Sequence, residues 1–431
     1  MSGTKLLDEI LDGLTIKWKP LGEIAEIYGG LSGKTKSDFD GGTSKFIPYK
    51  NIFANSDVDF GALEHVSVSI DEHQNAVKYG DVLFTGSSEI ADEAGMSSAV
   101  ATSPSDPVYL NSFSFGVRFN DDTPLIPEFT KHLFRARTLR AEIARTASGV
   151  TRFNVSKDRF KKICIPILCP DDPKRSIAIQ TRIAGILDAF AELTAELTAE
   201  LTARKTQYSH YRDQLLRFDG EDAEWKALGE IGEFIRGKRF TKADFVDHGI
   251  DAIHYGEIYT RYGVWTDHAV TKVRSDLQGS LRYARPNDVV LTGVGETVED
   301  VGKAVAWIGS GNVAIHDDSY AFRHSMNPKY IAYAMQTASF IDEKAKHVSR
   351  GKVNRLLVDG VAKVRVPIPY PNDAEKSLAE QARIVAILDK FDALTNSITE
   401  GLPKEIELRQ KQYEYYRDLL LSFPKPHQGA A

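Results

Sequence analysis

The sequence predicts an α+β protein in which two mixed α/β domains are joined by two long helices that pair as an antiparallel coiled coil. Three observations predict this architecture. One sequence unit occurs twice along the 431-residue chain. Each copy opens with a glycine-rich region of short β-type runs. Each copy closes with a helical segment in which apolar residues recur in steps of four and three. The two copies are therefore expected to form a pseudo-two-fold internal repeat.

The duplication is visible in three motifs that recur in the same order. They are Trp18–Ile24 and Trp225–Ile231, Gln180–Phe190 and Gln381–Phe391, and Tyr211–Asp213 and Tyr416–Asp418. Acidic, asparagine and proline residues precede the helical segments and mark their starts. They are Asp171-Asp172-Pro173 in the first copy and Pro369, Pro371 and Asn372 in the second. The boundaries that we predict are 1–172 and 219–372 for the domains, 173–218 and 373–424 for the helices, and 425–431 for a tail.

Composition places the chain among globular proteins of the cytoplasm. Hydrophobic residues make up 42% and charged residues 26%, and the net charge is -6. No stretch approaches the roughly 20 apolar residues of a membrane span, and the acidic residues near the N-terminus argue against a signal peptide. The only cysteines, Cys164 and Cys169, do not form a zinc or disulfide framework, and we expect both to be buried strand residues.

Each helical segment has an a/d stripe, the pattern by which helices supercoil around a partner. A core-facing helix is the alternative explanation for any single stripe, but two matched stripes favour mutual pairing. Gly401 and Pro403 interrupt the second stripe, so the distal helix should kink or break there. The helix-pairing and partner-docking candidates are Ile183, Leu187, Phe190, Leu197, Leu201, Tyr208, Tyr211, Leu215, Ile384, Leu388, Phe391, Ile398, Tyr413, Tyr416 and Leu420.

The first helix contains a tandem Ala-Glu-Leu-Thr repeat over residues 191–202. Each copy adds about 6 Å of helix at 1.5 Å per residue. A repeat of this kind can change in copy number without destroying a fold, so the helix can act as an adjustable rod.

Positive charge is concentrated at the same place in both copies of this acidic protein. Residues 131–162 contain ten basic and two acidic side chains, and residues 329–365 contain eight basic and three acidic ones. A solvated helix face is the usual explanation for a charge run, but its duplication favours binding of a polyanion such as DNA or RNA.

The loops Ser148–Asn154 and Ser349–Arg355, together with the glycine-basic loops Gly33–Lys36 and Gly237–Arg239, combine glycine with donors for phosphates and base edges. A turn that needs glycine only for its backbone angles is the alternative at all four places. The DNA-binding candidates are Lys34, Lys36, Lys50, Ser87, Arg145, Thr151, Arg152, Asn154, Lys238, Arg239, Tyr255, Arg261, Arg350, Lys352, Asn354 and Arg355.

Enzyme motifs are incomplete in this sequence. The segment Gly29–Thr35 has three residues between glycines where a P-loop needs four. Asn327–Tyr330 is similar to a motif of amino-methyltransferases, but its counterpart in the first copy is unrelated and no glycine-rich cofactor loop accompanies it. His316-Asp317-Asp318 could suggest a metal site, although a structural turn is favoured. The sequence therefore predicts neither a catalytic site nor a metal site.

The doubled Trp-Lys-x-Leu-Gly-Glu-Ile segments, the Gln-x-Arg-Ile-x-x-Ile-Leu-Asp-x-Phe helix starts and the Tyr-Arg-Asp helix ends resemble specificity subunits of type I restriction–modification systems. The resemblance covers essentially the whole chain. The Ala-Glu-Leu-Thr tract, with the segment Ile398–Pro403, is similar to the IC subgroup.

The resemblance implies two target-recognition domains, each reading one half of a split site in double-stranded DNA, held apart by the paired helices. It implies a subunit that is not catalytic by itself. Two methyltransferase subunits would dock to it to form an adenine-specific DNA methyltransferase, and up to two restriction subunits would complete an ATP-dependent endonuclease for defence against foreign DNA. S-adenosylmethionine, ATP and Mg²⁺ would belong to those partners, with no cofactor in this chain.

Two other functions remain open from the sequence. A non-catalytic scaffold with two protein-binding domains would explain the duplication but not the basic segments. A self-sufficient methyltransferase that uses Asn327–Tyr330 would need to bind S-adenosylmethionine by itself.

Overall fold

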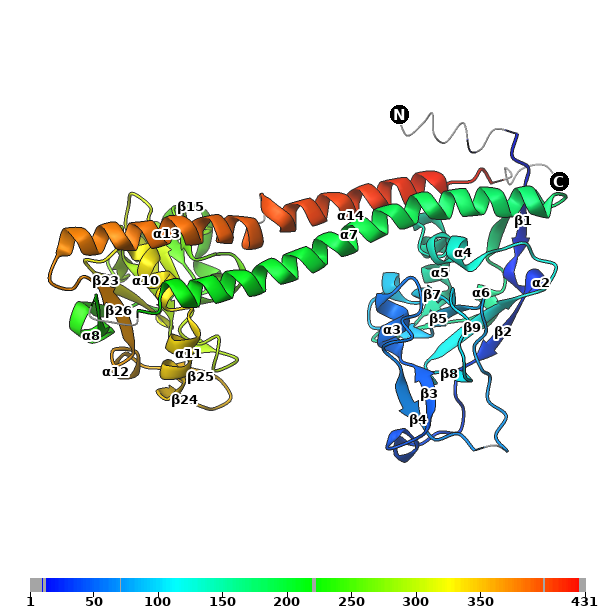
Figure 1. Cartoon of the computed structure of the whole chain (residues 1–431), viewed down its shortest axis with the longest axis horizontal. Coiled ribbons are helices and arrows are strands. Elements are labelled where there is room, and N and C mark those ends of the chain that lie inside the picture. Colours follow the sequence, from blue (N-terminus) through cyan, green and yellow to red (C-terminus); the bar gives the residue numbers. More distant parts are fainter. Residues whose placement is uncertain (1–9, 11–12, 70, 219–221, 398–399, 426–431) are drawn as a thin grey trace. The chain divides into compact units, whose positions relative to one another are not determined.

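The computed structural model describes residues 10, 13–69, 71–218, 222–397 and 400–425, which form two compact units (Figure 1). One unit comprises residues 1–195 and 408–431, and the other comprises residues 196–407. Of the predicted tail, residues 425–431, the structure describes only Lys425. The stripe residue Ile398 also lies outside the described residues. Among the helices that the structure describes, none combines the length and apolar character needed to cross a bilayer.

The globular part of the first unit is built from several small sheets. Its strands are β1 (Ile16–Pro20), β2 (Ala25–Gly29), β3 (Ser44–Ile47), β4 (Glu64–Val66), β5 (Val82–Thr85), β6 (Ser87–Ser88), β7 (Ser97–Ala99), β8 (Val108–Leu110), β9 (Ser114–Phe119), β10 (Ala147–Ser148), β11 (Phe153–Val155) and β12 (Cys164–Leu168). They form sheets in the orders β2-β9-β5-β7, β4-β3-β8, β10-β11-β6 and β1-β12. Its short helices are α2 (Leu21–Ile24), η1 (Lys36–Phe39), α3 (Tyr49–Ala54), η2 (Ala91–Glu93), α4 (Pro127–Leu133), α5 (Arg137–Thr146) and α6 (Lys157–Phe160).

The second unit repeats this plan. Its strands are β13 (Ala223–Ala227), β14 (Gly232–Arg236), β15 (Phe245–Ile253), β16 (Trp265–Thr266), β17 (Thr271–Val273), β18 (Tyr283–Ala284), β19 (Val289–Thr292), β20 (Val294–Gly295), β21 (Ala304–Trp307), β22 (Val313–Ile315), β23 (Ser319–His324), β24 (Val348–Ser349), β25 (Asn354–Leu356) and β26 (Arg365–Pro369). The sheet orders are β14-β23-β19-β21-β16, β17-β15-β22-β18, β20-β25-β24 and β13-β26. Its short helices are α8 (Leu228–Ile231), η3 (Lys242–Asp244), α9 (Tyr255–Thr260), η4 (Ser275–Leu277), α10 (Pro328–Ala334), α11 (Ala338–Ala345) and α12 (Val358–Val361).

Each long helix begins directly after an acidic residue. Helix α7 (Pro173–Leu215) starts after Asp172, whose carboxylate accepts the Arg175 N–H at 3.0 Å. Helix α13 (Ala374–Asn396) starts after Asp373, whose carboxylate accepts the Lys376 N–H at 3.0 Å. These caps satisfy backbone donors that a helix start leaves unpaired.

The distal helix is interrupted, as its glycine and proline predict. Helix α13 ends at Asn396, and α14 (Gly401–Leu420) starts after four intervening residues. Gly401 has φ of +75°, a backbone conformation that favours glycine. Pro403 lies in the first turn of α14, where the missing N–H costs no intrahelical hydrogen bond.

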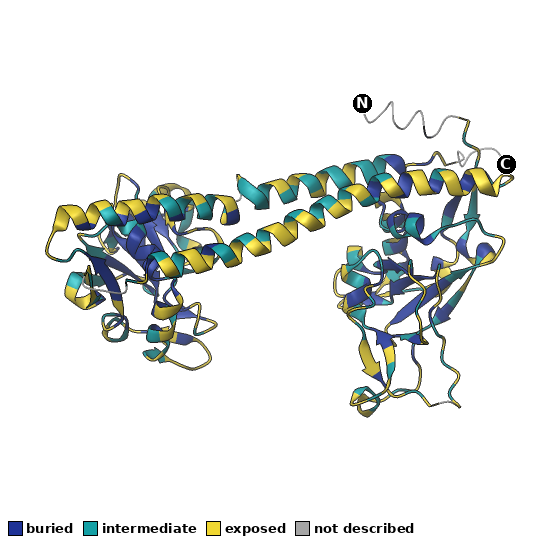
Figure 2. Cartoon of the chain, viewed as in Figure 1, coloured by how far each residue is buried: buried dark blue, intermediate teal, exposed yellow. Residues whose placement is uncertain are grey.

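Both explanations of the apolar stripes are correct in part. Ile183 and Leu187 are fully buried in the core of the first domain, as Ile384 and Leu388 are in that of the second. Figure 2 shows buried residues interspersed with exposed ones along the long helices. Aromatic residues of the stripes pair helix with helix. In the first unit Phe190 of α7 stacks on Tyr416 of α14 at 5.0 Å, and in the second unit Phe391 of α13 stacks on Tyr211 of α7 at 5.5 Å. The start of α7 thus meets the end of the distal segment, which is antiparallel pairing.

The repeated motifs attach each domain to its helices. In the first unit the buried Gln180 accepts a hydrogen bond from the Ile126 N–H at 3.0 Å, and Asp418 accepts one from the Arg137 N–H at 3.0 Å. The second unit has the same contacts at its equivalent positions. They join Gln381 to the Asn327 N–H at 2.9 Å and Asp213 to the Ala338 N–H at 3.5 Å. In every case the helix supplies a side chain and the domain supplies a backbone amide.

The two cysteines differ from the expectation in one respect each. Cys164 lies in β12 but is only half-buried, and Cys169 is buried but follows the strand at φ of 42°. Both are free thiols.

Acidification is expected to destabilise the second unit. Burial lowers the pKa of His324 to about 4, against about 6.5 in an unfolded chain. The unfolded state therefore binds more protons between these values, so stability is complete above pH 6.5 and falls as the pH drops toward 4, by roughly 3 kcal/mol. Calorimetry of the wild type and His324→Gln should show a flatter pH dependence in the variant.

Candidate nucleic-acid interface

A three-stranded sheet brings together candidate DNA-binding residues of the first domain. In the β10-β11-β6 sheet, Asn154 pairs with Ser87 across neighbouring strands. The Arg152 guanidinium donates to the Ser87 hydroxyl at 2.9 Å and lies 5.6 Å above the ring of the exposed Phe113. Thr151 is exposed in the loop between β10 and β11. Ser87 itself is buried, so it orients Arg152 in this structure.

The second domain has the same sheet at the equivalent place. In β20-β25-β24, Arg355 pairs with Val294 and Ser349, and its side chain is exposed. Asn354 is buried and donates to the Glu296 carbonyl at 2.8 Å. The Asn354 side chain therefore holds the loop after β20.

Several of the basic residues counted in the two charged segments are structural. The Arg135 guanidinium donates to the carbonyls of Ser97, Ile52, Phe53 and Asn55. Burial lowers its pKa to about 10, which leaves it charged at neutral pH. Fewer basic side chains of the two charged segments therefore reach the surface than the residue count implies.

Arg140 and Lys344 hold equivalent loops in the two domains. Arg140 donates to the carbonyls of Asp92 and Ala94, and Lys344 donates to those of Glu299 and Val301. Lys131 and Lys329 in turn form ion pairs with Asp188 of α7 and Asp389 of α13, at 2.7 and 2.8 Å.

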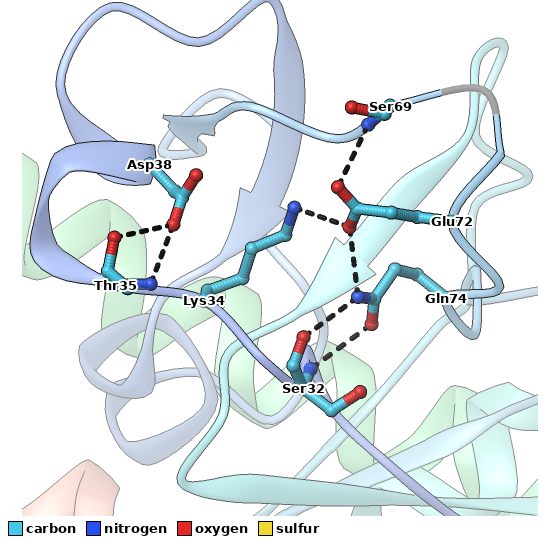
Figure 3. Close-up of polar contacts among 7 residues, drawn as sticks. All are labelled: Ser32, Lys34, Thr35, Asp38, Ser69, Glu72 and Gln74. Atoms are coloured by element: carbon cyan, nitrogen blue, oxygen red, sulfur yellow. Dashed lines mark hydrogen bonds and ion pairs between the residues drawn. The ribbon is translucent and has the colours of Figure 1, made fainter.

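Lys34 is also engaged within the first domain (Figure 3). Its side chain is only 4% exposed and its amine forms an ion pair with Glu72. That ion pair, with hydrogen bonds from Gln74 and Ser69, lowers the pKa of Glu72. The Gln74 side chain also accepts a hydrogen bond from the Ser32 N–H and donates one to the Ser32 carbonyl. These bonds join the segment around Gln74 to the loop that carries Lys34. Lys34 is therefore engaged inside the domain, and little of its side chain reaches the surface.

The equivalent loop of the second domain borders an open cavity of about 500 Å³, which we call the basic hollow. It is lined by Arg236, Arg239, Phe240, Thr241, Lys242, His254, Tyr255, His316, Asp317, Asp318 and Arg355. Four of these side chains are arginine or lysine, and four are aromatic rings that form one cluster around His316. The ring centroids of His254 and Tyr255 lie 4.8 and 5.1 Å from that of His316.

Two histidines, His254 and His316, line the basic hollow. Burial, followed by the charges of His316 and Lys242, lowers the pKa of His254 to about 4, so its ring is neutral at neutral pH. His316 Nδ1 accepts the Asp318 N–H at 3.1 Å, which is the structural turn that the sequence predicts. Ligand atoms of His316, Asp317 and Asp318 also lie within 4.8 Å of one another, so this turn has the residue types of a cation site.

The structure thus groups some candidates and separates others. Ser87, Arg152 and Asn154 meet in one sheet, and Arg239, Tyr255 and Arg355 line one cavity. The other basic candidates are exposed on separate loops and helices of their domains, and they are Lys36, Lys50, Arg145, Lys238, Arg261, Arg350 and Lys352. The sequence analysis missed Arg236, Lys242, His254 and the role of His316. Arg236 could have been included, because it directly precedes the Gly237–Arg239 loop.

Comparisons with known proteins match this chain over nearly its whole length. A family model described as type I restriction modification DNA specificity domain matches residues 15–204 and 220–408. The EcoR124I/EcoR124II specificity subunit of Escherichia coli is 33% identical, covering 99% of this chain and 99% of that protein. A putative type I restriction enzyme specificity subunit of Haemophilus influenzae is 30% identical, covering 97% of this chain and 98% of that protein.

A solved structure shares the fold. It was determined in a study of complex assembly and conformational transition of the type I R-M system. Its chain superposes with a TM-score of 0.63 at 15% identity, covering 94% of this chain and 97% of that one. Together with the duplicated domains and their basic surfaces, these matches establish that the chain belongs to the family of DNA specificity subunits of type I restriction–modification systems.

Proposed function

We propose that this chain reads a bipartite DNA sequence, one half-site with each domain, within a complex of two methyltransferase subunits and up to two restriction subunits. Residues 1–172 and 219–372 are the two target-recognition domains of this proposal, and residues 173–218 and 373–424 are the spacer helices. The observation that supports it best is the recurrence of one three-stranded sheet, each with an exposed arginine, in two domains of a specificity-subunit family.

In this proposal the exposed basic side chains hold phosphates and the polar ones read base edges. The phosphate contacts come from Lys36, Lys50, Arg145, Arg152, Lys238, Arg239, Arg261, Arg350, Lys352 and Arg355. The base contacts come from Thr151, Asn154 and Tyr255. Lys34, Ser87 and Asn354 support these residues rather than contact DNA, because their side chains are engaged inside the domains.

Catalysis belongs to the partners. The methyltransferase subunits supply S-adenosylmethionine chemistry on adenine, and the restriction subunits supply ATP-driven cleavage with Mg²⁺. This chain supplies the choice of sequence, and it acts in the cytoplasm, where DNA and partners are present.

The experiment that tests this function maps adenine methylation across the genome of cells that express the chain with its methyltransferase partner. A split motif that appears only when this chain is present is the expected result. If the partner is present and no new motif appears, the chain is a scaffold instead.

Replacement of Arg152 by glutamine is expected to weaken DNA binding of the chain–methyltransferase complex without altering its sequence preference. A lost phosphate contact reduces the slope of log K against log salt by about 0.9. Titrations between low and physiological salt measure that slope. Lys162→Gln, an exposed change in the same basic segment outside the candidate sheet, should leave the slope unchanged. Equal slopes for wild type and Arg152→Gln would remove Arg152 from the interface.

A further inference from the structure

We propose that Asp317 and Asp318, which line the basic hollow, accept a hydrogen bond from the exocyclic amino group of a cytosine in the second half-site. The basic side chains around them hold the flanking phosphates. This inference rests on the proposed function, because it names one base contact of the second domain.

Asp317 presents an oxygen that needs a donor. Its Oδ1 is buried and has no hydrogen-bond donor among the described residues. The ring nitrogen His316 Nδ1 lies 3.2 Å from an Asp317 oxygen, but it already accepts the Asp318 N–H at 3.1 Å, so in this arrangement it does not donate to Asp317. An unpaired buried acceptor costs free energy, and a donor from a ligand would satisfy it.

The surrounding charges suit a nucleic acid. The Arg236 guanidinium donates to the Asp317 carbonyl at 2.9 Å, which fixes a positive charge beside the two carboxylates. Arg355 approaches Asp318 only to 3.8 Å, and Arg239 and Lys242 are exposed at the rim. Four basic groups therefore outweigh two acidic ones around the cavity. The four basic side chains attract a polyanion. The carboxylates of Asp317 and Asp318 then favour a base that presents a hydrogen-bond donor.

The base that fits a carboxylate is cytosine. In the major groove cytosine presents its N4 amino donor, whereas guanine and thymine present acceptors that a carboxylate repels. Adenine places an acceptor beside its donor and is better matched by asparagine or glutamine. The pair Asp317 and Asp318 therefore discriminates for cytosine.

The first domain lacks this feature at the equivalent position. The counterpart of Asp318 is Asn111, whose Nδ2 donates to the Ile47 carbonyl and whose Oδ1 accepts from the Phe113 N–H and the Ser114 hydroxyl. The counterpart of Arg236, the last residue of its strand, is Gly29. The turn of the first domain is thus internally satisfied, and the cytosine contact is a property of the second domain.

The test compares methylation motifs of cells that carry the methyltransferase partner with the wild-type chain, Asp317→Asn or Asp318→Asn. The wild-type motif should contain a cytosine in the second half-site. The variants should relax that position or shift it toward adenine, and the first half-site should stay the same. Asp276→Asn, an exposed acidic residue of the same domain outside the basic hollow, should leave the whole motif unchanged.

Duplex binding by the purified complex provides the second readout. Replacing the cytosine pair with a T·A pair should weaken wild-type binding by roughly 5- to 150-fold. The Asp318→Asn complex should lose most of this discrimination while it keeps its affinity for non-target DNA, which shows that it is folded. Full discrimination in both aspartate variants would overturn the inference.

Two further results would also overturn it. Stoichiometric Mn²⁺ binding by the wild type, absent in Asp317→Asn, with DNA discrimination lost in EDTA, would make the turn a cation site instead. A wild-type motif whose second half-site lacks cytosine would refute the inference and leave the proposed function standing. The absence of any motif would refute both.

Discussion

Replacing Arg135 with methionine is expected to destabilise the first unit by roughly 3 kcal/mol or more, because each orphaned buried carbonyl costs about 1 to 3 kcal/mol. Arg135 joins the backbone of β7 to the end of α3 through four carbonyls, and methionine offers no donor to any of them. Calorimetry of the full chain should show an earlier transition for the first unit and an unchanged one for the second.

Arg145 gives the matched control. It belongs to the same basic segment but is exposed near the end of α5. Arg145→Met should leave thermal stability within about 0.5 kcal/mol of wild type, as surface changes usually do. It should instead reduce the salt dependence of DNA binding. A destabilised Arg145→Met protein with an intact salt slope would assign the two arginines the opposite way.

Deleting one Ala-Glu-Leu-Thr unit, residues 195–198, is expected to shorten the preferred gap between half-sites and to leave both half-site sequences unchanged. Four residues remove about 6 Å of helix. At 3.4 Å per base pair this corresponds to about one to two base pairs. The deletion removes little packing, because Ala195, Glu196 and Thr198 are exposed on α7 and Leu197 is only half-buried.

Methylation mapping of the deletion variant measures both properties at once. A variant of equal length, Thr198→Ala, is the control and should keep the wild-type gap. A change in either half-site sequence, with the gap preserved, would contradict the idea that helix length sets the spacing.

The features that sequence predicted well are local or repeated. The start of α7 at Pro173 and the interruption before Pro403 follow from backbone geometry that a few neighbouring residues dictate. The short β-type runs expected in the opening region of each copy include β3 and β5 in the first domain. The duplication identified the shared attachment residues, although it did not reveal what they bind.

The features that sequence missed depend on partners far along the chain. Arg135 and Arg152 belong to the same charged segment, yet one is buried among carbonyls about 80 residues away and the other reaches the surface. The basic hollow joins residues from β14, the loop before α9, the β22–β23 turn and β25, which only the tertiary fold brings together. Charge counting cannot separate these cases, because it contains no information on acceptors.

The hydrogen bonds that attach each domain to its helices have a consequence for how this chain can diverge. In the four hydrogen bonds that Gln180, Gln381, Asp213 and Asp418 accept, the domain side is a main-chain amide, which every residue except proline possesses. Substitutions in the domain therefore leave these anchors intact as long as the backbone keeps its course. Residues of the recognition surface can therefore change without loss of these four hydrogen bonds, whereas the ion pairs of Lys131 with Asp188 and of Lys329 with Asp389 need a particular side chain on both sides. The hydrogen bonds that attach each domain to its helices are in this way largely independent of the side chains on the recognition surface of that domain.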